Sequence, residues 1–489
     1  MMYSSLIYSF LEKNASLLVN VASTIVLSRL LTPIETGIFS VAAAFINISQ
    51  FLRDFGVTNY IIQEEHLTDQ RLRSAMGLSM SMGFALFLIF LSSSGAVSAF
   101  FGEPQLKSVI SILSMNFLVV AVASIGTARL SRIMNYRTVS LINFASTVTF
   151  SAVSITLATA GYGAVSIAWA SFLGVVAVIL GQIVAMRRDV FIRPSLAGWR
   201  PLIRFGSFAS GNGMLTTLIQ RGPDILIGRL MGFADAGLFS RGNSLVTLFE
   251  SALLSSVRPV VANGLAVIRR QGRPLDAPLL QCYSYLSAVA WPFLSVLGLL
   301  AHPIILIMFG DQWTSSIPPA RWLCLAALFG TLTNIAAMAL TSVGAMRTLF
   351  FFQCLSASFG VLAVTVGCFI GLQAVAMGMV AASALSAMVS LHKVKTTFGV
   401  PILAILRSMA KSAAVTVATS VPPALVLVYW GFGHTHLWAP TLVATAGAAT
   451  AWMLAVWMVG HPLGRELIRV VARARPAIEP KLQAVDWVT

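Results

Sequence analysis

Charged side chains are scarce in this sequence. They make up 10% of its 489 residues, whereas hydrophobic residues make up 57%. An ordinary soluble domain carries about 25% charged residues, and a soluble chain of this length would form several domains with polar surfaces. Too little charge is present to cover such surfaces. The deficit therefore excludes a soluble protein and predicts that most of the chain is surrounded by lipid.

Cysteine and acidic residues are also rare. The four cysteines lie singly within apolar stretches, so the sequence predicts neither a disulfide framework nor a metal site. The 32 basic residues outnumber the 16 acidic ones, and the formal charge is +16. On a soluble protein this charge would suggest nucleic acid, but here the basic residues are distributed among loops, so we expect no nucleic-acid partner. No phosphate-binding loop, nucleotide fingerprint or catalytic triad is visible. We therefore expect no cofactor, no catalytic residue and no enzyme activity.

Long apolar runs recur along almost the whole chain. A helix needs about 20 mostly apolar residues to cross the hydrocarbon layer, and only helices or closed barrels satisfy their backbone hydrogen bonds there. We therefore expect an all-α polytopic membrane protein of about fourteen transmembrane helices. The predicted spans lie near residues 14–32, 36–62, 75–100, 109–127, 139–160, 162–186, 206–231, 236–261, 280–309, 320–344, 348–370, 372–391, 409–431 and 437–460.

The basic residues provide an independent test of this topology. Cytoplasmic loops of membrane proteins carry an excess of lysine and arginine. Alternate loops of the predicted chain hold most of the 32 basic residues, whereas the loops between them are short and hold only Lys107. This alternation predicts that both termini are cytoplasmic.

An internal repeat relates two parts of the chain. The segment LSRLLTPIETGIFS at 27–40 aligns without gaps to IGRLMGFADAGLFS at 227–240. A chance match is the alternative in so apolar a chain, but both copies lie at equivalent helix ends. Six predicted spans separate them, so they share one orientation, as in transporters built from two lobes. We predict an N-terminal lobe, a cytoplasmic linker, a C-terminal lobe, a terminal helix pair and a cytoplasmic tail, with boundaries 1–186, 187–205, 206–396, 397–460 and 461–489.

Ionisable residues within the spans are concentrated in the first two helices of each lobe. Such residues cost about 2.5–3.5 kcal/mol each at the bilayer centre, so they usually face a cavity or a partner. Arginine binds phosphate in a bidentate manner and keeps its proton. An excess of arginine therefore indicates an anionic, phosphorylated substrate. The predicted substrate-binding residues are Arg29, Arg53, Arg221, Arg229 and Arg241.

Simpler roles stay open for these arginines. Arg29, Arg229 and Arg241 lie near the outer ends of their spans, where their side chains could extend to the interface instead. Arg221 lies three residues before Asp224, a spacing that allows a structural ion pair. The fifth arginine, at position 53, could anchor its helix in the inner leaflet.

Two acidic residues of the same helices, Asp224 and Glu250, are candidates for ion or proton coupling. Glu250 is isolated near the middle of its span. A carboxyl group at that depth usually faces a cavity or a partner, and it can carry a proton. A neutral, hydrogen-bonded structural role is the alternative for Glu250.

Three segments resemble those of a known family. LSRLLTPIETGIFSVAAAF at 27–45 and LRDFGVTNYIIQ at 52–63 are similar to the opening of polysaccharide biosynthesis flippases. DILIGRLMGFADAGLFSRGNSL at 224–245 resembles the second lobe of the same family. These flippases belong to the multidrug/oligosaccharidyl-lipid/polysaccharide exporter superfamily. The resemblance covers roughly residues 5–460.

The resemblance implies a V-shaped pair of lobes around a cationic cavity in the bacterial inner membrane. It further implies flipping of an undecaprenyl-pyrophosphate-linked oligosaccharide from the cytoplasmic to the periplasmic leaflet. By family position, Arg29, Arg221 and Arg229 would meet the pyrophosphate, and Arg241 would be the match in the eighth span. Membrane lipids, a polysaccharide polymerase and the chain-length machinery are the implied partners.

Three other functions are weighed against this one. A multidrug exporter of the same superfamily would place acidic groups opposite its cationic drugs, whereas arginine dominates here. A flippase for the peptidoglycan precursor is chemically close and stays open. A sugar-polymerising membrane enzyme would show a large periplasmic loop and positioned carboxylates, and the sequence has neither.

Overall fold

The structure is a computed structural model in which regular secondary structure is helical wherever the chain is described. Eleven of the described helices are long and apolar enough to cross a membrane. The all-α polytopic fold is thus confirmed, while the number of fourteen spans stays a prediction. Most of the predicted linker 187–205 and tail 461–489 lies outside the described residues. The structure describes residues 2–54, 57–64, 68–186, 193–195, 200–251, 255–430, 437–464 and 466.

The chain packs into two compact units. The lobe boundaries predicted from the sequence stay a prediction. Unit 1 comprises Met1–Ser244, Met308–Pro319 and Leu349–Met379. Unit 2 comprises Leu245–Ile307, Ala320–Thr348 and Val380–Thr489.

The helices of unit 1 run in sequence from the N-terminus, and a few elements continue from one unit into the other. Unit 1 holds α1 (Met2–Leu30), α2 (Pro33–Asp54), α3 (Val57–Gln63), α4 (Asp69–Phe101), α5 (Pro104–Arg132), α6 (Tyr136–Thr159), α7 (Ala164–Met186), α8 (Arg200–Leu230), most of α9 (Phe233–Phe249), the 3₁₀ helix η3 (Asp311–Ser316) and most of α14 (Met346–Cys368). Unit 2 holds α10 (Ser255–Arg270), α11 (Asp276–Leu299), most of α12 (Ala301–Phe309), most of α13 (Ile317–Ser342), most of α15 (Leu372–Phe398), α16 (Ile402–Tyr429) and α17 (Trp438–Met458).

Local sequence signals set the ends of these helices. Thr32 and Glu35 form a reciprocal cap at the start of α2: the Thr32 N–H donates to the Glu35 carboxylate at 2.8 Å, and the Glu35 N–H donates to the Thr32 hydroxyl at 3.3 Å. Pro33 occupies the first helical position, where its missing N–H costs nothing. After α4, Gly102 has a φ of +71°, a conformation that glycine adopts without strain. These signals fix where along α2 and α4 each side chain lies.

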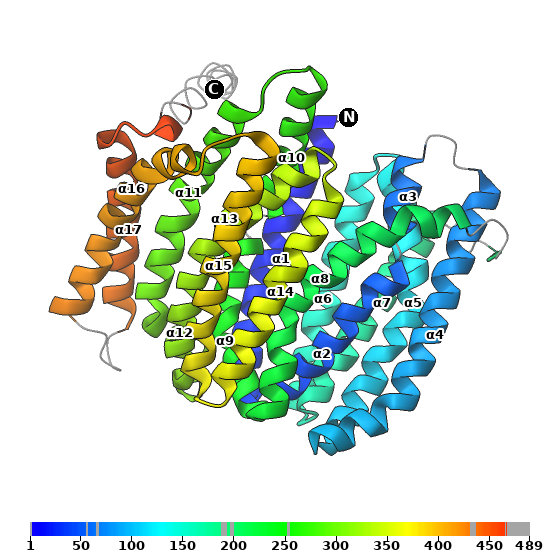
Figure 1. Cartoon of the computed structure of the whole chain (residues 1–489). Helices are drawn as coiled ribbons and strands as arrows, with labels where there is room; N and C mark the ends of the chain where they lie inside the picture. The colour runs from blue at the N-terminus through cyan, green and yellow to red at the C-terminus, as the bar shows by residue number, and fades with distance from the viewer. Residues whose placement is uncertain are drawn as a thin grey trace, which may run out of the picture. The chain divides into compact units, whose positions relative to one another are not determined.

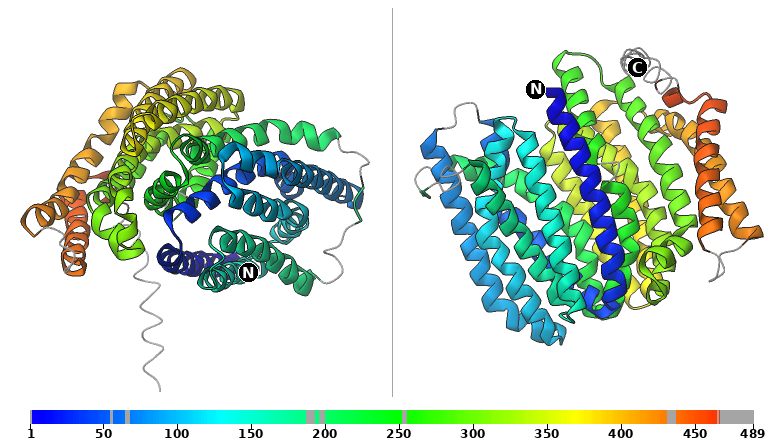
Figure 2. Two further views of the ribbon diagram at one scale, coloured as in Figure 1. Left: turned by 90° about the horizontal axis from the view of Figure 1, so that it is seen from below. Right: turned by 180° about the vertical axis from the view of Figure 1, so that it is seen from behind.

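Within unit 1 the first seven long helices form a continuous packed set. α4 packs against α5, α5 against α7, α7 against α6, and α6 against α1 (Figures 1 and 2). α2 packs against α5 and α8. This packing places polar side chains of α1, α2, α5 and α7 near one another and near α8.

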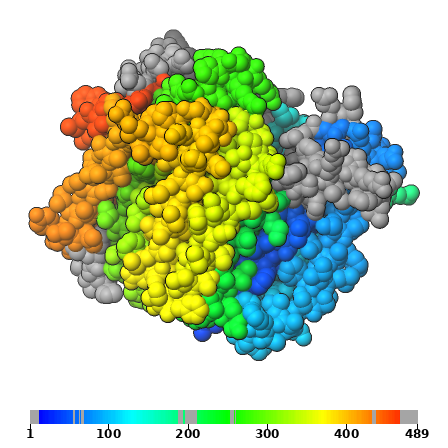
Figure 3. Space-filling view, in the orientation of Figure 1, coloured from blue at the N-terminus to red at the C-terminus, as the bar shows by residue number. Residues whose placement is uncertain are grey.

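The surface of α4 carries large apolar side chains. Phe84, Leu88, Ile89 and Leu91 are all exposed on this helix, which forms part of the molecular surface coloured mid-blue in Figure 3. In water, each exposed apolar side chain of this size would forgo about 1.5–3 kcal/mol of burial free energy. Such a surface fits contact with lipid, as expected for a membrane span.

The two copies of the internal repeat meet in unit 1. A Cβ atom added at Gly37 of α2 would lie 1.8 Å from the Phe233 carbonyl oxygen, and one added at Gly237 of α9 would lie 1.9 Å from the Pro33 carbonyl oxygen. The hydroxyl of Ser40 donates to that of Ser240 at 2.9 Å. Each contact joins segments about 200 positions apart. The starts of α2 and α9 therefore cross each other, and a local two-fold symmetry relates the two segments. Only glycine allows the two backbones to approach this closely.

The predicted spans at 36–62 and 236–261 are each described in two parts, because residues 55–56 and 252–254 lie outside the described residues. The first is represented by α2 and α3, and the second by α9 and α10. The chain at the end of α9 adopts a π-helical turn at Glu250 and Ser251, and such turns commonly mark a bend or a functional site.

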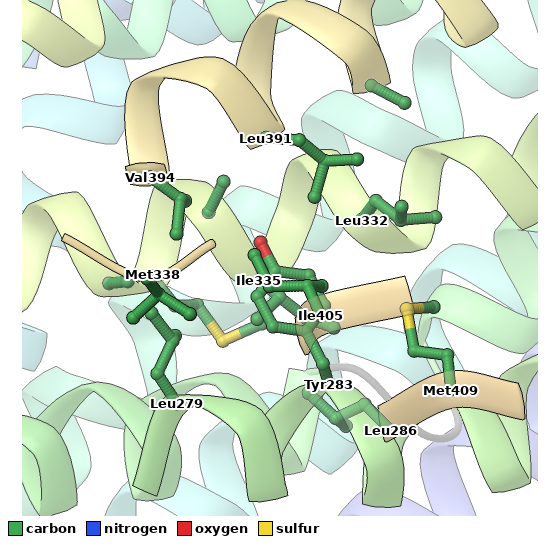
Figure 4. Close-up of a cluster of buried hydrophobic side chains, with 14 of the residues drawn as sticks. Leu279, Tyr283, Leu286, Leu332, Ile335, Met338, Leu391, Val394, Ile405 and Met409 are labelled. Atoms are coloured by element: carbon green, nitrogen blue, oxygen red, sulfur yellow. The ribbon is translucent and has the colours of Figure 1, made fainter. Parts of the chain in front are cut away.

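The core of unit 2 lies where four of its helices converge. Apolar side chains from α11, α13, α15 and α16 interdigitate around the buried ring of Tyr283 (Figure 4). Helices surrounded by lipid gain stability from such close van der Waals packing rather than from the hydrophobic effect. The labelled members of this core are Leu279, Tyr283, Leu286, Leu332, Ile335, Met338, Leu391, Val394, Ile405 and Met409.

A buried histidine follows α17 in unit 2. His461 is 1% exposed, and its Nε2 atom lies 3.2 Å from the hydroxyl oxygens of both Ser284 and Ser412. Its Nδ1 atom accepts the N–H of Leu463 at 3.1 Å. Protonation of the ring would place its second proton on Nδ1, where that proton would point at the N–H of Leu463 and break this hydrogen bond. Burial, together with the nearby charge of Lys411, lowers the pKa of His461 below its ordinary value.

Acidification is expected to destabilise unit 2 through His461. Because the folded-state pKa is lower than the unfolded one, the unfolded chain binds more protons as the pH falls below about 6.5, and stability falls with it. We expect the melting temperature of the purified protein to fall between about pH 7.5 and about pH 5.5. The variant His461→Gln should show a smaller fall over the same range. Equal falls in both proteins would contradict this role.

Candidate functional site

Unit 1 contains a cavity of about 360 Å³ that is lined by both polar and apolar side chains. Ligand-binding cavities span roughly 300–1,000 Å³, so this volume lies at the small end of that range. Its walls come from α1, α2, α5, α6, α7, α8 and α9. The four helices in which the sequence concentrates its ionisable residues, α1, α2, α8 and α9, all contribute.

One face of α2 forms a long wall of the cavity. Thr36, Ser40, Ala43, Asn47 and Gln50 all line it. They recur every three or four residues, which places them on one side of a helix with 3.6 residues per turn. This side of α2 therefore presents hydroxyl groups near its start and the amides of Asn47 and Gln50 further along.

The cationic part of the cavity comes from α8 and α9. Arg221 of α8 and Arg241 of α9 both line it, and no aspartate or glutamate is found among the described lining residues. Two guanidinium groups in a lining that holds no described carboxylate make this part of the cavity cationic. Guanidinium groups match phosphate oxygens in charge and in bidentate geometry. The cavity is thus suited to an anion that carries phosphate.

Aromatic side chains hold Arg241 in place. Its guanidinium carbon lies 4.9 Å from the ring centroid of Trp313 and 5.2 Å from that of Phe309. A cation over an aromatic face is stabilised by about 0.5–2 kcal/mol, and more when water is excluded. The Nε atom of Arg241 has no hydrogen-bond partner within the described part of the chain. Stacking thus orients the side chain, and its Nε donor stays without a partner among the described residues.

The residues that support Arg241 are themselves anchored. The indole N–H of Trp313 donates to the Ser28 carbonyl at 2.8 Å, and the Gln312 side-chain amide donates to the carbonyls of Ser28 and Leu31. These bonds tie η3 to the end of α1. Sequence analysis did not identify Trp313 or Phe309, because no local pattern reveals a contact with a residue about 70 positions away.

Asp224 is buried on α8, one turn from Arg221. It is 3% exposed and lies within the electrostatic influence of Arg221. It is absent from the cavity lining. An ion pair with Arg221 and a coupling role for Asp224 both stay predictions.

The other predicted arginines lie away from the cavity lining. Arg29 and Arg229 are exposed in the last turns of α1 and α8, and Arg229 stacks 4.5 Å from the centroid of the Phe100 ring. Arg53 of α2 is 5% exposed, and its Nε and Nη1 atoms have no partner within the described residues. Arg29 and Arg229 have the placement of interfacial anchors. Substrate binding by these three arginines stays a prediction.

Glu250 belongs to unit 2, in the π-helical turn that follows α9. It is partly exposed. Its predicted coupling role stays a prediction.

Solved structures with this fold identify the class of protein. A structure of the lipid II flippase MurJ in an inward closed conformation matches 95% of this chain and 100% of its own, with a TM-score of 0.72 and 14% identity. An inward-facing multidrug-resistance MATE transporter of the MOP superfamily matches 81% of this chain and 96% of its own, with a TM-score of 0.59 and 15% identity. At these identities the likeness shows the fold alone. The chain therefore shares the fold of these two proteins, and its long apolar helices are those of a multi-pass membrane protein.

The sequence identifies the family within that class. The model of the family described as "Polysaccharide biosynthesis protein" matches residues 26–318. The chain belongs to this family, which confirms the resemblance to polysaccharide biosynthesis flippases. Two curated relatives are the succinoglycan biosynthesis transport protein ExoT of Rhizobium meliloti (strain 1021) and the lipopolysaccharide biosynthesis protein WzxC of Escherichia coli (strain K12).

The matches to these relatives are partial. ExoT is 22% identical over 322 residues, which are 65% of either chain. WzxC is 21% identical over 322 residues, which are 63% of either chain. The chain thus spans slightly less than two thirds of the length of these relatives. The name of ExoT refers to succinoglycan biosynthesis and transport, and that of WzxC refers to lipopolysaccharide biosynthesis.

Proposed function

We propose that this protein flips a polyprenyl-pyrophosphate-linked oligosaccharide repeat unit from the cytoplasmic to the periplasmic leaflet of the bacterial inner membrane. The product would enter synthesis of an exopolysaccharide, a capsule or an O-antigen. Membership of the polysaccharide biosynthesis protein family supports the substrate class. The names of ExoT and WzxC support the same pathway type.

The observation that carries this proposal is the cavity with two arginines and no described acidic lining residue. Arg221 and Arg241 would bind the pyrophosphate, and their positive charge would replace the water that the phosphate loses on leaving the interface. Arg29, Arg53 and Arg229 are further proposed contacts along the path. Asp224 and Glu250 are the proposed sites of ion or proton coupling.

Alternating access of two lobes is the proposed mechanism. The lobes are 1–186 and 206–396, joined by the linker 187–205 and followed by the helix pair 397–460 and a cytoplasmic tail from 461. The repeat contact between Gly37 and Gly237 supports two related halves. The distribution of lysine and arginine supports cytoplasmic termini. A polysaccharide polymerase and the chain-length machinery are the proposed partners.

Two rival functions within the superfamily make different demands on the cavity. A multidrug exporter needs acidic groups for cationic drugs, and the lining described here has none. A peptidoglycan-precursor flippase would bind the same pyrophosphate, and the fold of MurJ is shared. That second candidate differs from the first in the sugar that it accepts.

Depletion of the protein in its host should test the proposal directly. Lipid-linked repeat units are expected to accumulate on the cytoplasmic leaflet, because the polymerisation step would receive no substrate on the other side. Their location can be measured by the action of a membrane-impermeant glycosidase on intact spheroplasts and on lysed ones.

The outcomes of the depletion experiment separate the three functions. Material cleaved only after lysis supports the proposal. Accumulated peptidoglycan precursor with normal polymer export would favour the second candidate. Unchanged lipid-linked pools together with new drug sensitivity would identify an exporter.

A further inference from the structure

A second chemical surface lies in the same cavity as the two arginines. Asn47 and Gln50 of α2, Asn116 of α5 and Ser171 of α7 line it. All four side chains are uncharged, and each can both donate and accept hydrogen bonds. The positive charge of the cavity comes from α8 and α9, whereas these neutral groups come from α2, α5 and α7.

Asn116 is the most constrained of the four. It is 5% exposed, and its Oδ1 atom has no hydrogen-bond partner within the described part of the chain. Its Nδ2 atom lies 3.5 Å from the hydroxyl oxygen of Ser171, at the long limit for a hydrogen bond. A buried acceptor without a partner costs about 1–3 kcal/mol. A ligand hydroxyl that donates to Oδ1 would recover this free energy.

The neighbouring amides extend the surface along α2. Asn47 and Gln50 are three residues apart, so both point to one side of the helix. Asn47 lies fourteen residues after Pro33, the first residue of α2, and Asn116 lies twelve residues after Pro104, the first residue of α5. These spacings correspond to about 20 Å of helix in each case, and α2 packs against α5. The three amides therefore lie at a similar depth along two packed helices and line the same cavity.

We infer that this amide surface is a sugar-binding subsite, which holds the hydroxyl groups of the first sugar while Arg221 and Arg241 hold the pyrophosphate. This inference rests on the proposed function. The amide N–H groups and carbonyl oxygens are complementary to adjacent hydroxyls on a pyranose ring, each of which also donates and accepts. A carboxylate would add negative charge beside the pyrophosphate, and the described lining contains none.

The subsite makes the protein selective for the sugar next to the phosphate. A cavity of about 360 Å³ accommodates the phosphate and the adjoining sugar rather than a whole repeat unit. A site built to hydrogen-bond a substrate hydroxyl discriminates strongly against a substrate that lacks it, because its own polar groups are then left unpaired. The remaining sugars would contribute less to recognition.

Two lipid probes distinguish sugar binding from phosphate binding. The first is undecaprenyl pyrophosphate, and the second is the same lipid carrying one neutral hexose, with glucose and galactose tested in parallel. Affinities are measured by native mass spectrometry on the full-length protein in detergent. We expect Asn116→Leu to weaken binding of one or both hexose lipids about tenfold and to leave the affinity for undecaprenyl pyrophosphate within about twofold. Leucine has a similar volume, and it removes both hydrogen-bonding atoms.

Controls keep the result interpretable. Asn143 of α6 is exposed and absent from the cavity lining, so Asn143→Leu should change neither affinity. Asn47→Leu and Gln50→Leu are independent tests at partly exposed positions that tolerate substitution better than a buried one. The melting temperature of each variant reports whether it folds.

Each outcome decides a separate question. Equal weakening of both probes by Asn116→Leu and Asn47→Leu, or no change in either, would overturn the subsite and leave phosphate binding intact. A wild-type protein that binds neither probe would overturn the proposed function itself, and the subsite with it. Selective loss of hexose-lipid binding supports the subsite.

Discussion

Replacement of Gly37 by alanine is expected to disrupt assembly of the protein and abolish polymer export. The added Cβ would lie 1.8 Å from the Phe233 carbonyl oxygen, a distance that real contacts do not reach. The opposing atom belongs to the backbone, so no change of side-chain rotamer can relieve the overlap. Overpacking of this kind costs about 1–3 kcal/mol, and more when the backbone must move. Folded yield and melting temperature of a fluorescently tagged protein, together with polymer export, measure the effect.

The repeat predicts a matching effect at the equivalent position. Gly237→Ala would bring its Cβ atom to 1.9 Å from the Pro33 carbonyl oxygen and should be as damaging as Gly37→Ala. Gly95 in α4 is the control, because a Cβ atom there meets nothing within 4 Å. Gly95→Ala should be neutral or stabilise by up to about 1 kcal/mol. Wild-type melting temperature and export in Gly37→Ala would show that the two helices do not cross as described.

Sequence reasoning located the cavity through the cost of burying charge. Arginines in a chain with so few charges indicated that α1, α2, α8 and α9 face something other than lipid, and all four line the cavity. Which arginines face it depends on the rotation of each helix about its axis. Arg221 and Arg229 lie on the same helix, yet only Arg221 is among the lining residues. A difference of eight residues turns a side chain by about 80° from its starting direction at 3.6 residues per turn.

The supporting residues of the cavity could not be predicted in the same way. Asn116 belongs to an ordinary apolar span, and its role follows from the packing of α5 against α2 and α7. Trp313 and Phe309 reach Arg241 through a short segment between two helices. Such contacts depend on tertiary packing, for which hydrophobic periodicity contains no signal. The repeat aligned Ser40 with Ser240, but the hydrogen bond between them could not be predicted, because equivalent positions of a duplication need not touch.

The geometry around Arg241 makes the chemistry of its side chain testable, beyond its charge. Lysine would keep the positive charge, but it would lose the planar group that stacks on Trp313 and Phe309 and the bidentate fit to phosphate. Alanine would remove both. A charge-assisted hydrogen bond contributes about 1.5–3 kcal/mol, which corresponds to about a tenfold to hundredfold change in affinity.

We therefore expect Arg221→Ala and Arg241→Ala each to weaken binding of undecaprenyl pyrophosphate about tenfold to hundredfold, with loss of polymer export and normal membrane insertion. Arg241→Lys should fall between wild type and Arg241→Ala, because its charge remains while its orientation is lost. Arg321 is an exposed arginine of α13 in unit 2, and Arg321→Ala serves as the control with unchanged affinity. Binding is measured on the purified protein, and export in a strain that lacks the wild-type copy. If Arg241→Lys matched wild type in both measurements, the aromatic support would only fill space, and charge alone would account for phosphate binding in this cavity.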